Sequence, residues 1–288
     1  MTVPFVDAMR TPYESCPLCA GELRVLRDQD WSWREDFRQP LLPVIRWMVC
    51  GECGHQCTWG PLTAEGMQLV FSHTQAGQTP AGLRSSQVEA ERYTWGKVVD
   101  AVARFQPDGR WLDVGAGSGM LLGLARECGY EVTGSDLRES TAEALRARGF
   151  NTINGDLANL RSEWPDTFDV ISMCDVLEHV PFPMPALMGV WGALKPGGIL
   201  FLSSPNRASL AWEVLDEENV NPYWAEIEHC HNFSYPRLRE VLSGIGFEPL
   251  GCSVSNRYRV GMDVLARRPS AARRGSRSSR PPVATPAD

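Results

Sequence analysis

A glycine-rich loop carries the strongest chemical signal in this chain of 288 residues. A hydrophobic strand pattern ends near Asp113 and continues into the run Gly115-Ala-Gly-Ser-Gly119, and a helical pattern starts at Met120. Glycines permit a tight turn and close approach of a ligand, and a helix N-terminus offers free N–H groups. Dinucleotide binders need G-x-G-x-x-G, but Met120 stands where the third glycine would be. Because the Asp113 carboxylate would repel a pyrophosphate, the loop favours a ligand with a cationic ammonium group.

Polar side chains also stand where the following strands end. Asp136, with Leu137 after it, lies 23 residues beyond Asp113, and a carboxylate at the end of a second strand can accept both ribose hydroxyls of an adenosine. The run Asn154-Gly-Asp156-Leu157 ends the third strand, where Asp156 could meet an adenine amino group. The fourth strand runs into Cys174. These positions predict a site for a nucleoside-containing ligand.

Histidines in the second half of the chain are the candidate general bases. His179 follows the fourth strand, and His229 and His231 lie in the run 228–234. An imidazole is suited to removing a proton near neutral pH. We predict His179 or His229 as the base. We expect either His229 or His231 to make a structural hydrogen bond that fixes its segment.

Two C-x-x-C pairs indicate a metal site near the N-terminus. Cys16 and Cys19 form the first pair, Cys50 and Cys53 form the second, and 30 residues separate the pairs. Four thiolates are the ligand set of tetrahedral zinc, and a closed shell of four protein ligands is typical of structural zinc. The sequence therefore predicts a zinc ribbon. His55 and Cys57 are spare potential ligands.

Alternating strand and helix patterns must position these side chains. Between residues 92 and 266, strand patterns cover 110–114, 131–136, 152–154, 168–173, 198–203 and 260–265, with helical patterns over 92–105, 120–128, 140–148 and 185–194 and one ending at 247. Such alternation predicts a Rossmann-like, doubly wound, mostly parallel α/β sheet. We expect a ribbon over 12–60, a connector over 61–91, the α/β domain over 92–266 and a disordered tail over 267–288. Ribbon and α/β domain should each have a core of their own.

The motifs in this order resemble a class I S-adenosylmethionine-dependent methyltransferase. The resemblance rests on D-V-G-A-G-S-G at 113–119, the acid at 136, G-D-L at 155–157, D-V-L-E-H-V at 175–180 and L-K-P-G-G at 194–198. The chain is similar to the methyltransferase type 23 family and to ubiquinone-biosynthesis O-methyltransferases, over residues 92–266. Five motifs in register are far more specific than a glycine loop alone.

The resemblance implies a role for each residue of the loop and strand ends. Gly115 and Gly117 would pack against the methionine part of the cofactor, with Asp113 acting near its ammonium group. Asp136 would hold the ribose, with Leu137 beside it in the cofactor site. The adenine would lie against Asp156 and Leu157, and Cys174 would lie close to the methionine end.

The resemblance also bears on the acceptor side. The run 228–234 resembles the E-H-x-H-x-F-S segment common in this family. Some quinone O-methyltransferases use acidic side chains and a divalent ion, so Glu178 and His179 could be metal ligands; a carboxylate at a helix start is the competing interpretation. The insertion 205–235 is rich in aromatic residues, which would form either a lid over an apolar acceptor or a small core: Trp212, Tyr223, Trp224, Phe233 and Tyr235.

Composition narrows the class of acceptor. The net charge is −7, and residues 1–60 contain six arginines against eight acidic residues, which disfavours nucleic acid. We predict a methyltransferase for a small molecule in bacterial specialised metabolism, with O-methylation favoured and N- or C-methylation open. The alternatives are an RNA methyltransferase and a non-catalytic cofactor-binding regulator. The chain shows no secretory signal or membrane span, and we expect a cytoplasmic protein. The acceptor, the oligomeric state and the role of the ribbon stay undetermined by the sequence.

Overall fold

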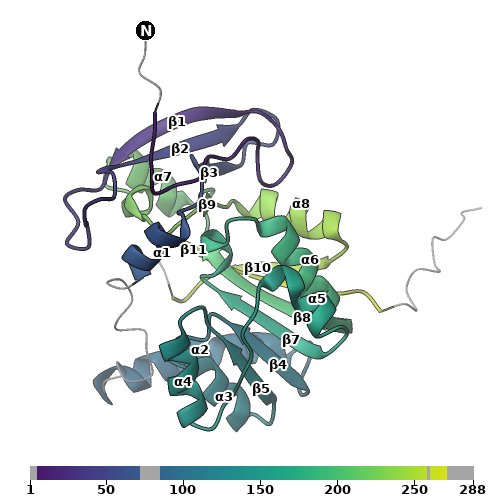
Figure 1. Ribbon diagram of the computed structural model, residues 1–288. Coiled ribbons are helices and arrows are strands. Elements are labelled where there is room, and N and C mark those ends of the chain that lie inside the picture. The colour runs from purple at the N-terminus through teal and green to yellow at the C-terminus, as the bar shows by residue number, and fades with distance from the viewer. Residues whose placement is uncertain (1–4, 72–84, 258–259, 271–288) are drawn as a thin grey trace, which may run out of the picture.

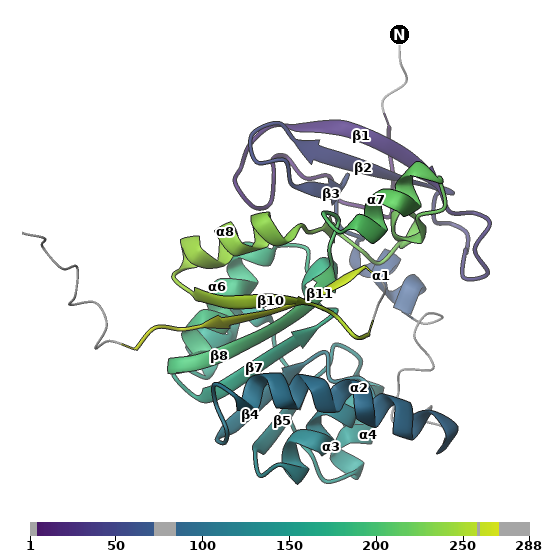
Figure 2. The same ribbon diagram turned by 180° about the vertical axis from the view of Figure 1, so that it is seen from behind.

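A seven-stranded sheet forms the centre of the computed structural model, which describes residues 5–71, 85–257 and 260–270 (Figures 1 and 2). The strand order is β10-β11-β8-β7-β4-β5-β6. Five strands run parallel: β4 (Arg110–Val114), β5 (Glu131–Ser135), β6 (Asn151–Thr152), β7 (Phe168–Cys174) and β8 (Leu194–Pro205). The edge pair β10 (Glu248–Val254) and β11 (Gly261–Arg267) is antiparallel. The predicted mostly parallel α/β sheet is confirmed.

Helices cover both faces of this sheet. One core packs α2 (Ser85–Ala103), α3 (Met120–Glu127) and α4 (Glu139–Ala147) against it, and the other packs α5 (Leu160–Glu163), α6 (Pro183–Ala193) and α8 (Tyr235–Ile245). Side chains of β4 alternate between the two cores, with Trp111 in one and Leu112 in the other. Among the residues described, no helix is long and apolar enough to cross a membrane.

Several elements have no counterpart in the sequence prediction, and three of them are longer than one turn or a single strand pair. The longest are α1 (Ala64–Phe71) within the expected connector, α7 (Leu210–Glu217) and β10, and the short α5 and β9 (His231–Asn232) were not predicted either. β10 is an edge strand with mostly exposed side chains, so it lacks the apolar alternation from which strands are predicted. Residues 72–84 of the expected connector and 271–288 of the expected tail lie outside the described residues.

A second sheet joins the N-terminal ribbon to the rest of the chain (Figure 1). Its order is β1 (Leu23–Asp30), β2 (Val44–Cys50), β3 (Gln56–Thr58) and β9 (His231–Asn232), and all three pairings are antiparallel. The fourth strand therefore comes from residues within the α/β domain.

The expectation that ribbon and α/β domain have separate cores is wrong. The first shared cluster joins Cys16, Leu18 and Cys50 of the ribbon to Phe233 and Leu238. In the second, Trp31 and Trp47 of the ribbon pack with residues of the insertion: Trp212, Trp224 and Ile227. A small module such as the ribbon buries little surface alone, and burying its apolar faces against the α/β domain stabilises both parts.

Close packing of α6 holds the chain that follows β6. A Cβ added to Gly189 would lie 1.9 Å from the carbonyl oxygen of Leu157, so Gly189→Ala must displace either α6 or that segment. Overpacking of this kind costs roughly 1–3 kcal/mol or more. We expect a correspondingly lower urea midpoint. The control is Gly123→Ala in α3, where an added Cβ would have no atom within 4 Å. This substitution should raise the stability of the helix by up to about 1 kcal/mol. Equal midpoints for the two variants would contradict this prediction.

Candidate active site

The glycine loop lies between β4 and α3, at the edge where the parallel strands end. Gly115 and Gly117 have φ angles of 70° and 49°, in the left-handed region that glycine adopts without strain. The amides of Gly115 and Ala116 donate to the carbonyl oxygen of Ser135 at 2.7 and 2.9 Å. The loop is thus tied to the end of β5, which brings it to the acidic residue that follows.

Asp136 follows β5 and is hydrogen-bonded to the loop. Its Oδ2 accepts from the Gly117 amide at 3.1 Å, and its Oδ1 accepts from the Arg138 amide at 3.0 Å. The Arg138 guanidinium also pairs with it, with Nε 3.1 Å from Oδ1. Next to this carboxylate, the side chain of Leu137 is 84% exposed. The carboxylate can accept hydrogen bonds from ribose hydroxyls, and the exposed apolar side chain beside it can contact the attached base.

Asp113 lies inside the sheet near its carboxyl edge. The carboxylate is 4% exposed, and its Oδ1 accepts from the Ser172 hydroxyl at 2.6 Å. Burial raises the pKa of Asp113 to about 7. The Ser172 hydrogen bond and the charge of Arg257 lower this pKa, whereas the charge of Asp136 adds to the rise. A buried carboxyl with this pKa gains a favourable partner when a cationic group comes close.

The remaining predicted cofactor residues lie at the same edge because the strands that carry them run parallel. Asp156 caps the short helix η3 (Leu157–Asn159), accepting from the Ala158 amide at 3.0 Å, and is exposed. Leu157 is half-buried. Cys174 ends β7 and is 9% exposed, and burial raises the pKa of its thiol to about 12. Its thiol is therefore protonated at neutral pH.

The structure brings together His179 and His229, 50 residues apart in sequence. Their ring centroids are 4.7 Å apart, and the ring planes meet at 85°. One ring nitrogen from each histidine and one carboxylate oxygen of Glu178 all lie within 4.8 Å of one another. His179 belongs to the short helix η4 (Leu177–His179), directly after β7, and His229 precedes β9. The histidine pair thus sits beside the edge that carries the predicted cofactor residues.

Burial keeps Glu178, His179 and His229 uncharged near neutral pH. It raises the pKa of Glu178 to about 8 and lowers the pKa of His179 to about 4, and it lowers the pKa of His229 well below its ordinary value. His179 Nδ1 lies 3.2 Å from the Glu228 carbonyl oxygen, which can only accept. Nδ1 therefore carries the hydrogen, and Nε2 is the basic nitrogen.

The same three side chains could hold a divalent ion. Glu178 Oε2 and His229 Nδ1 are buried without a hydrogen-bond partner. Two imidazole nitrogens and one carboxylate oxygen form a set that suits first-row divalent metals. The geometry therefore accommodates either a general base or a metal ligand at His179.

His231 is separated from this pair by its hydrogen bonds. Its Nε2 lies 3.0 Å from the Val180 carbonyl oxygen, and its Nδ1 lies 3.1 Å from His55 Nε2. A carbonyl only accepts, so His231 donates through Nε2 and accepts from His55 through Nδ1. Both ring nitrogens are engaged, which makes His231 the structural histidine of its segment.

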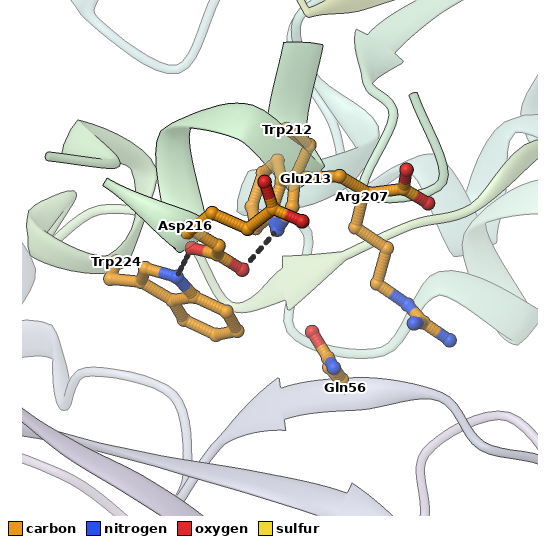
Figure 3. A pocket seen from close by; sticks show the side chains of 7 residues that line it. Gln56, Arg207, Trp212, Glu213, Asp216 and Trp224 are labelled. Atoms are coloured by element: carbon orange, nitrogen blue, oxygen red, sulfur yellow. Dashed lines mark hydrogen bonds between the residues drawn. The ribbon is translucent and has the colours of Figure 1, made fainter. Parts of the chain in front are cut away.

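The aromatic residues of the insertion form a core rather than a lid. Trp212 and Trp224 are 3% and 4% exposed, and Asp216 accepts from both indole nitrogens, at 3.0 and 2.6 Å (Figure 3). They flank a hollow of about 310 Å³ between ribbon and insertion, which Gln56 and Arg207 also line. Tyr223 stacks on Trp212 with centroids 5.4 Å apart and lies 6.5 Å from the His229 ring. This core therefore backs the histidine pair.

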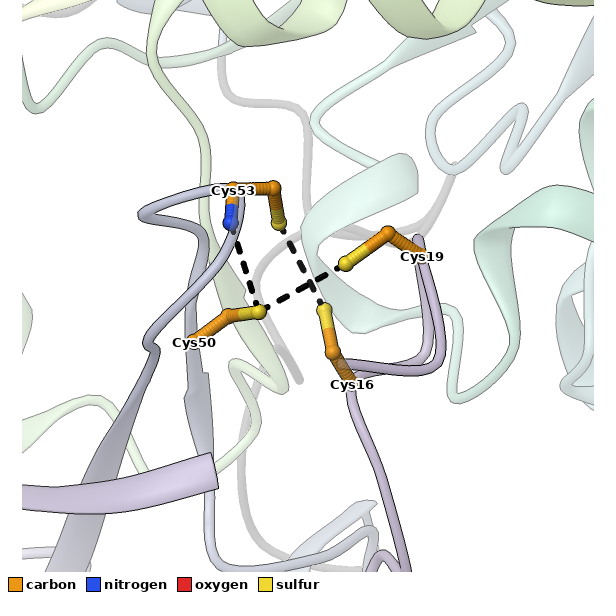
Figure 4. A group of neighbouring side chains, drawn as sticks. All are labelled: Cys16, Cys19, Cys50 and Cys53. Carbon is orange, nitrogen blue, oxygen red and sulfur yellow. Dashed lines mark hydrogen bonds between the residues drawn. The ribbon is translucent and has the colours of Figure 1, made fainter. Parts of the chain in front are cut away.

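The four predicted metal ligands converge at the ribbon's end (Figure 4). Sγ atoms of Cys19 and Cys50 are 3.5 Å apart, those of Cys16 and Cys53 are 3.7 Å apart, and all four lie within 4.8 Å of one another. Zn–S bonds of about 2.3 Å in a tetrahedron require sulfurs about 3.8 Å apart. The Cys53 amide also points at Cys50 Sγ at 3.5 Å. The cluster fits a zinc ion, whereas His55 and Cys57 lie outside it.

Several residues at the site were missed in the sequence analysis. Arg257 pairs with Asp175, donates to the Ser203 hydroxyl at 3.2 Å and lies over the Trp95 ring at 4.1 Å. Tyr13 of the ribbon donates to the Pro181 carbonyl oxygen, and Arg10, just before the ribbon, donates to the Ile227 carbonyl oxygen. No local pattern indicates these contacts, because each joins residues more than 50 positions apart.

Comparison with known proteins agrees with this geometry. A methyltransferase-domain family profile matches residues 88–250, more than half of the chain. A ubiquinone biosynthesis O-methyltransferase from Proteus mirabilis is 36% identical over 110 residues, covering 36% of this chain and 45% of that protein. The namesake from Vibrio cholerae is 30% identical over 177 residues, covering 54% and 70%. The chain thus spans about half the length of the first of these relatives.

Solved structures share the fold. The PH0226 protein from Pyrococcus horikoshii superposes with a TM-score of 0.54 at 18% identity, covering 69% of this chain and 98% of that one. A candidate methyltransferase from Bacillus halodurans gives 0.51 at 15% identity, covering 62% and 100%. At such identities the likeness concerns the fold alone. With the profile match and the site geometry, it leads to one conclusion: the chain belongs to the methyltransferase domain family.

Proposed function

We propose that the protein transfers a methyl group from S-adenosylmethionine to a hydroxyl of a small-molecule acceptor. One observation carries this proposal. At one edge of the sheet, the glycine loop is hydrogen-bonded to Asp136, and a neutral histidine pair lies beside them. The cofactor supplies an activated methyl group. The chain's part is to hold the cofactor, orient the acceptor and receive the hydroxyl proton at His179 Nε2.

O-methylation is favoured because the relatives are named as O-methyltransferases. We place the reaction in the cytoplasm, since all nine cysteines are free of disulfides, as is usual in a reducing compartment. Bacterial specialised metabolism is our proposed setting, with no nucleic-acid partner. An acidic balance supports a small molecule rather than RNA.

The test uses radioactive S-adenosylmethionine labelled in its methyl group and a panel of simple catechols, phenols and amines as acceptor probes. Total bacterial RNA is a separate arm. Label in an extractable methylated catechol or phenol supports the proposal. Label only in amines, or acid-precipitable label only in RNA, overturns it. If calorimetry shows cofactor binding but no acceptor in either arm receives label, the alternative of a non-catalytic cofactor-binding regulator is favoured.

Cofactor binding should depend on pH through Asp113. The pKa of its buried carboxyl is raised to about 7, so the group is protonated at pH 5.5. A cationic ammonium favours the carboxylate, and binding should therefore release a proton. We expect affinity to rise by up to about tenfold per pH unit from 5.5 to 7 and to level off above. Calorimetry in two buffers measures affinity and proton release, and Asp113→Asn should abolish both dependences. A flat profile in the wild type would count against this role.

The pH dependence of stability has the opposite sign in the ligand-free protein. The folded pKa of Asp113 lies above the ordinary value of 3.8, so the unfolded state loses its proton first. The contribution of this group to stability should therefore fall as pH rises from about 4 to 7.

We infer that the four-cysteine cluster holds one zinc ion per chain. Zinc would be bound by Cys16, Cys19, Cys50 and Cys53, whose spacing fits a tetrahedron. Elemental analysis of protein purified without chelator should give about one zinc. Cys50→Ser should bring this close to zero, because a thiolate is lost from a closed shell. The control is Cys252→Ser, which removes an exposed thiol far outside the cluster and should leave the zinc content unchanged. Wild-type protein without zinc would refute the assignment.

A further inference from the structure

The ribbon is bonded to both segments that carry the candidate catalytic histidines. We call residues 178–182 and 227–232 the histidine segments. The Tyr13 hydroxyl donates to the Pro181 carbonyl oxygen at 2.6 Å, two residues beyond His179. Tyr13 also packs edge-on against the Phe182 ring and stacks near His231, with centroids 5.9 and 6.1 Å apart. The first histidine segment therefore rests on a ribbon residue.

Arg10, two residues before the ribbon, makes the corresponding contact with the second segment. Its side chain is 2% exposed. Nη2 donates to the Ile227 carbonyl oxygen at 2.9 Å, two residues before His229, and Nη1 donates to the Gly60 carbonyl oxygen at 2.7 Å. Asp7 lies 3.7 Å from Nε and supplies the countercharge. A buried guanidinium that joins two backbone carbonyls holds its neighbours in one geometry.

Backbone hydrogen bonds complete the connection. The Thr58 amide of the ribbon donates to the Cys230 carbonyl oxygen at 2.9 Å, and the Cys230 amide donates to the Glu178 carbonyl oxygen at 2.7 Å. The ribbon thus holds the second segment, and the second segment holds the first. By contrast, the glycine loop and Asp136 have hydrogen bonds to β5 and its following turn, and within the described part of the chain none of these bonds reaches the ribbon.

We propose that the ribbon, together with the preceding Arg10, is the acceptor-side wall of the active site, and that Arg10 and Tyr13 are positioning residues for His229 and His179. This rests on the proposed function. A displacement of a catalytic group by about 1 Å can lower the reaction rate strongly. Loss of either contact should therefore slow the methyl-transfer step. The two contacts should matter little for cofactor binding, which uses the glycine loop and Asp136.

The experiment compares four variants of the full chain. Tyr13→Phe removes one hydroxyl, and Arg10→Met removes the guanidinium. Arg10→Lys keeps the charge and is expected to restore part of the loss. The matched control is Arg46→Met, which breaks a bidentate ion pair with Asp28 inside the ribbon and touches neither histidine segment. The first readout is hydrogen exchange, in the presence of S-adenosylmethionine. The second is kcat and KM with the best catechol or phenol probe.

We expect exchange in residues 178–182 and 227–232 to speed up at least tenfold in Tyr13→Phe and Arg10→Met, with residues 115–136 unchanged. The value of kcat should fall at least tenfold while KM for S-adenosylmethionine stays within twofold. Arg46→Met should match the wild type in both readouts. Arg10→Lys should have a kcat between those of Arg10→Met and the wild type.

Two results would overturn the inference. One is unchanged exchange in the histidine segments of both variants. The other is faster exchange with wild-type kcat, which would make the contacts structural only. If the wild type methylates no probe, the proposed function fails, and the exchange readout alone decides whether the ribbon holds the histidine segments.

Discussion

Asp136→Ala is expected to weaken binding of S-adenosylmethionine by about 30- to 150-fold. The ribose loses a charged acceptor for its two hydroxyls, and charge-assisted hydrogen bonds contribute about 2–3 kcal/mol. The Gly117 amide also loses its acceptor, so the loop is less well ordered around the ligand. Isothermal calorimetry measures the dissociation constant directly. Asp136→Asn should fall between alanine and wild type, because its amide oxygen still accepts but carries no charge.

Glu139→Ala is the matched control for this prediction. Its carboxylate lies three residues away, is exposed, and pairs with Arg146 rather than with the glycine loop. Its removal should change the dissociation constant by less than twofold. Folding of each variant is checked by circular dichroism. Wild-type affinity in a folded Asp136→Ala protein would disprove the ribose assignment.

His179→Ala is expected to lower kcat by about 10²- to 10⁴-fold, the range that a positioned general base contributes. The tautomer assigned by the Glu228 carbonyl leaves Nε2 free to take the proton. His229→Ala should lower kcat at least tenfold, since its ring packs against His179. Both variants should keep the cofactor affinity of the wild type. Steady-state kinetics with the best probe, together with calorimetry, test this pattern.

The pH profile distinguishes this buried base from an ordinary histidine. Burial lowers the pKa of His179 to about 4, so its imidazole is neutral at all higher pH values. The value of kcat should therefore be flat from pH 5.5 to 7.5 and fall only near pH 4, rather than near the ordinary histidine value of 6.5. If both variants turn over like the wild type, neither histidine is the base, and proximity alone drives transfer.

Glu178→Gln separates a base from a metal ligand at the same place. For a general base, glutamine resembles the protonated carboxyl that burial favours at pH 7, and kcat should change little. For a divalent-ion site, the loss of an anionic ligand should abolish turnover at low metal concentration, and high concentrations of added Mg²⁺ or Mn²⁺ should restore it. A large loss of kcat in Glu178→Gln would therefore indicate that His179 is a metal ligand rather than a general base.

Much of the cofactor edge could be predicted from the sequence because its parts are local. A strand, a glycine loop and a helix follow one another within 110–127, and their periodicity and turn residues are short-range signals. Parallel strands end at one edge, so Asp113, Asp136 and Cys174 could be expected together before any coordinates were known. The two C-x-x-C pairs were informative for the same reason, since each pair is local and zinc chemistry joins them.

The acceptor side was decided by the tertiary structure. Sequence patterns left the role of each histidine open, and the hydrogen bonds of His231 to His55 and Val180 settled which one is structural. The aromatic insertion also admitted two interpretations, and the packing of Trp212 and Trp224 against the ribbon tryptophans makes it a core.

By itself, the sequence determined a methyltransferase-like sheet, its cofactor edge and a four-cysteine ribbon, because each depends on residues close together in the chain. Only the tertiary structure showed that ribbon and α/β domain are one body around the histidines. Arg10 meets the Ile227 carbonyl across 217 residues, and β9 joins the ribbon sheet through two residues with no strand pattern. Such contacts satisfy buried backbone groups wherever the fold brings them together, and no periodicity in the chain encodes them.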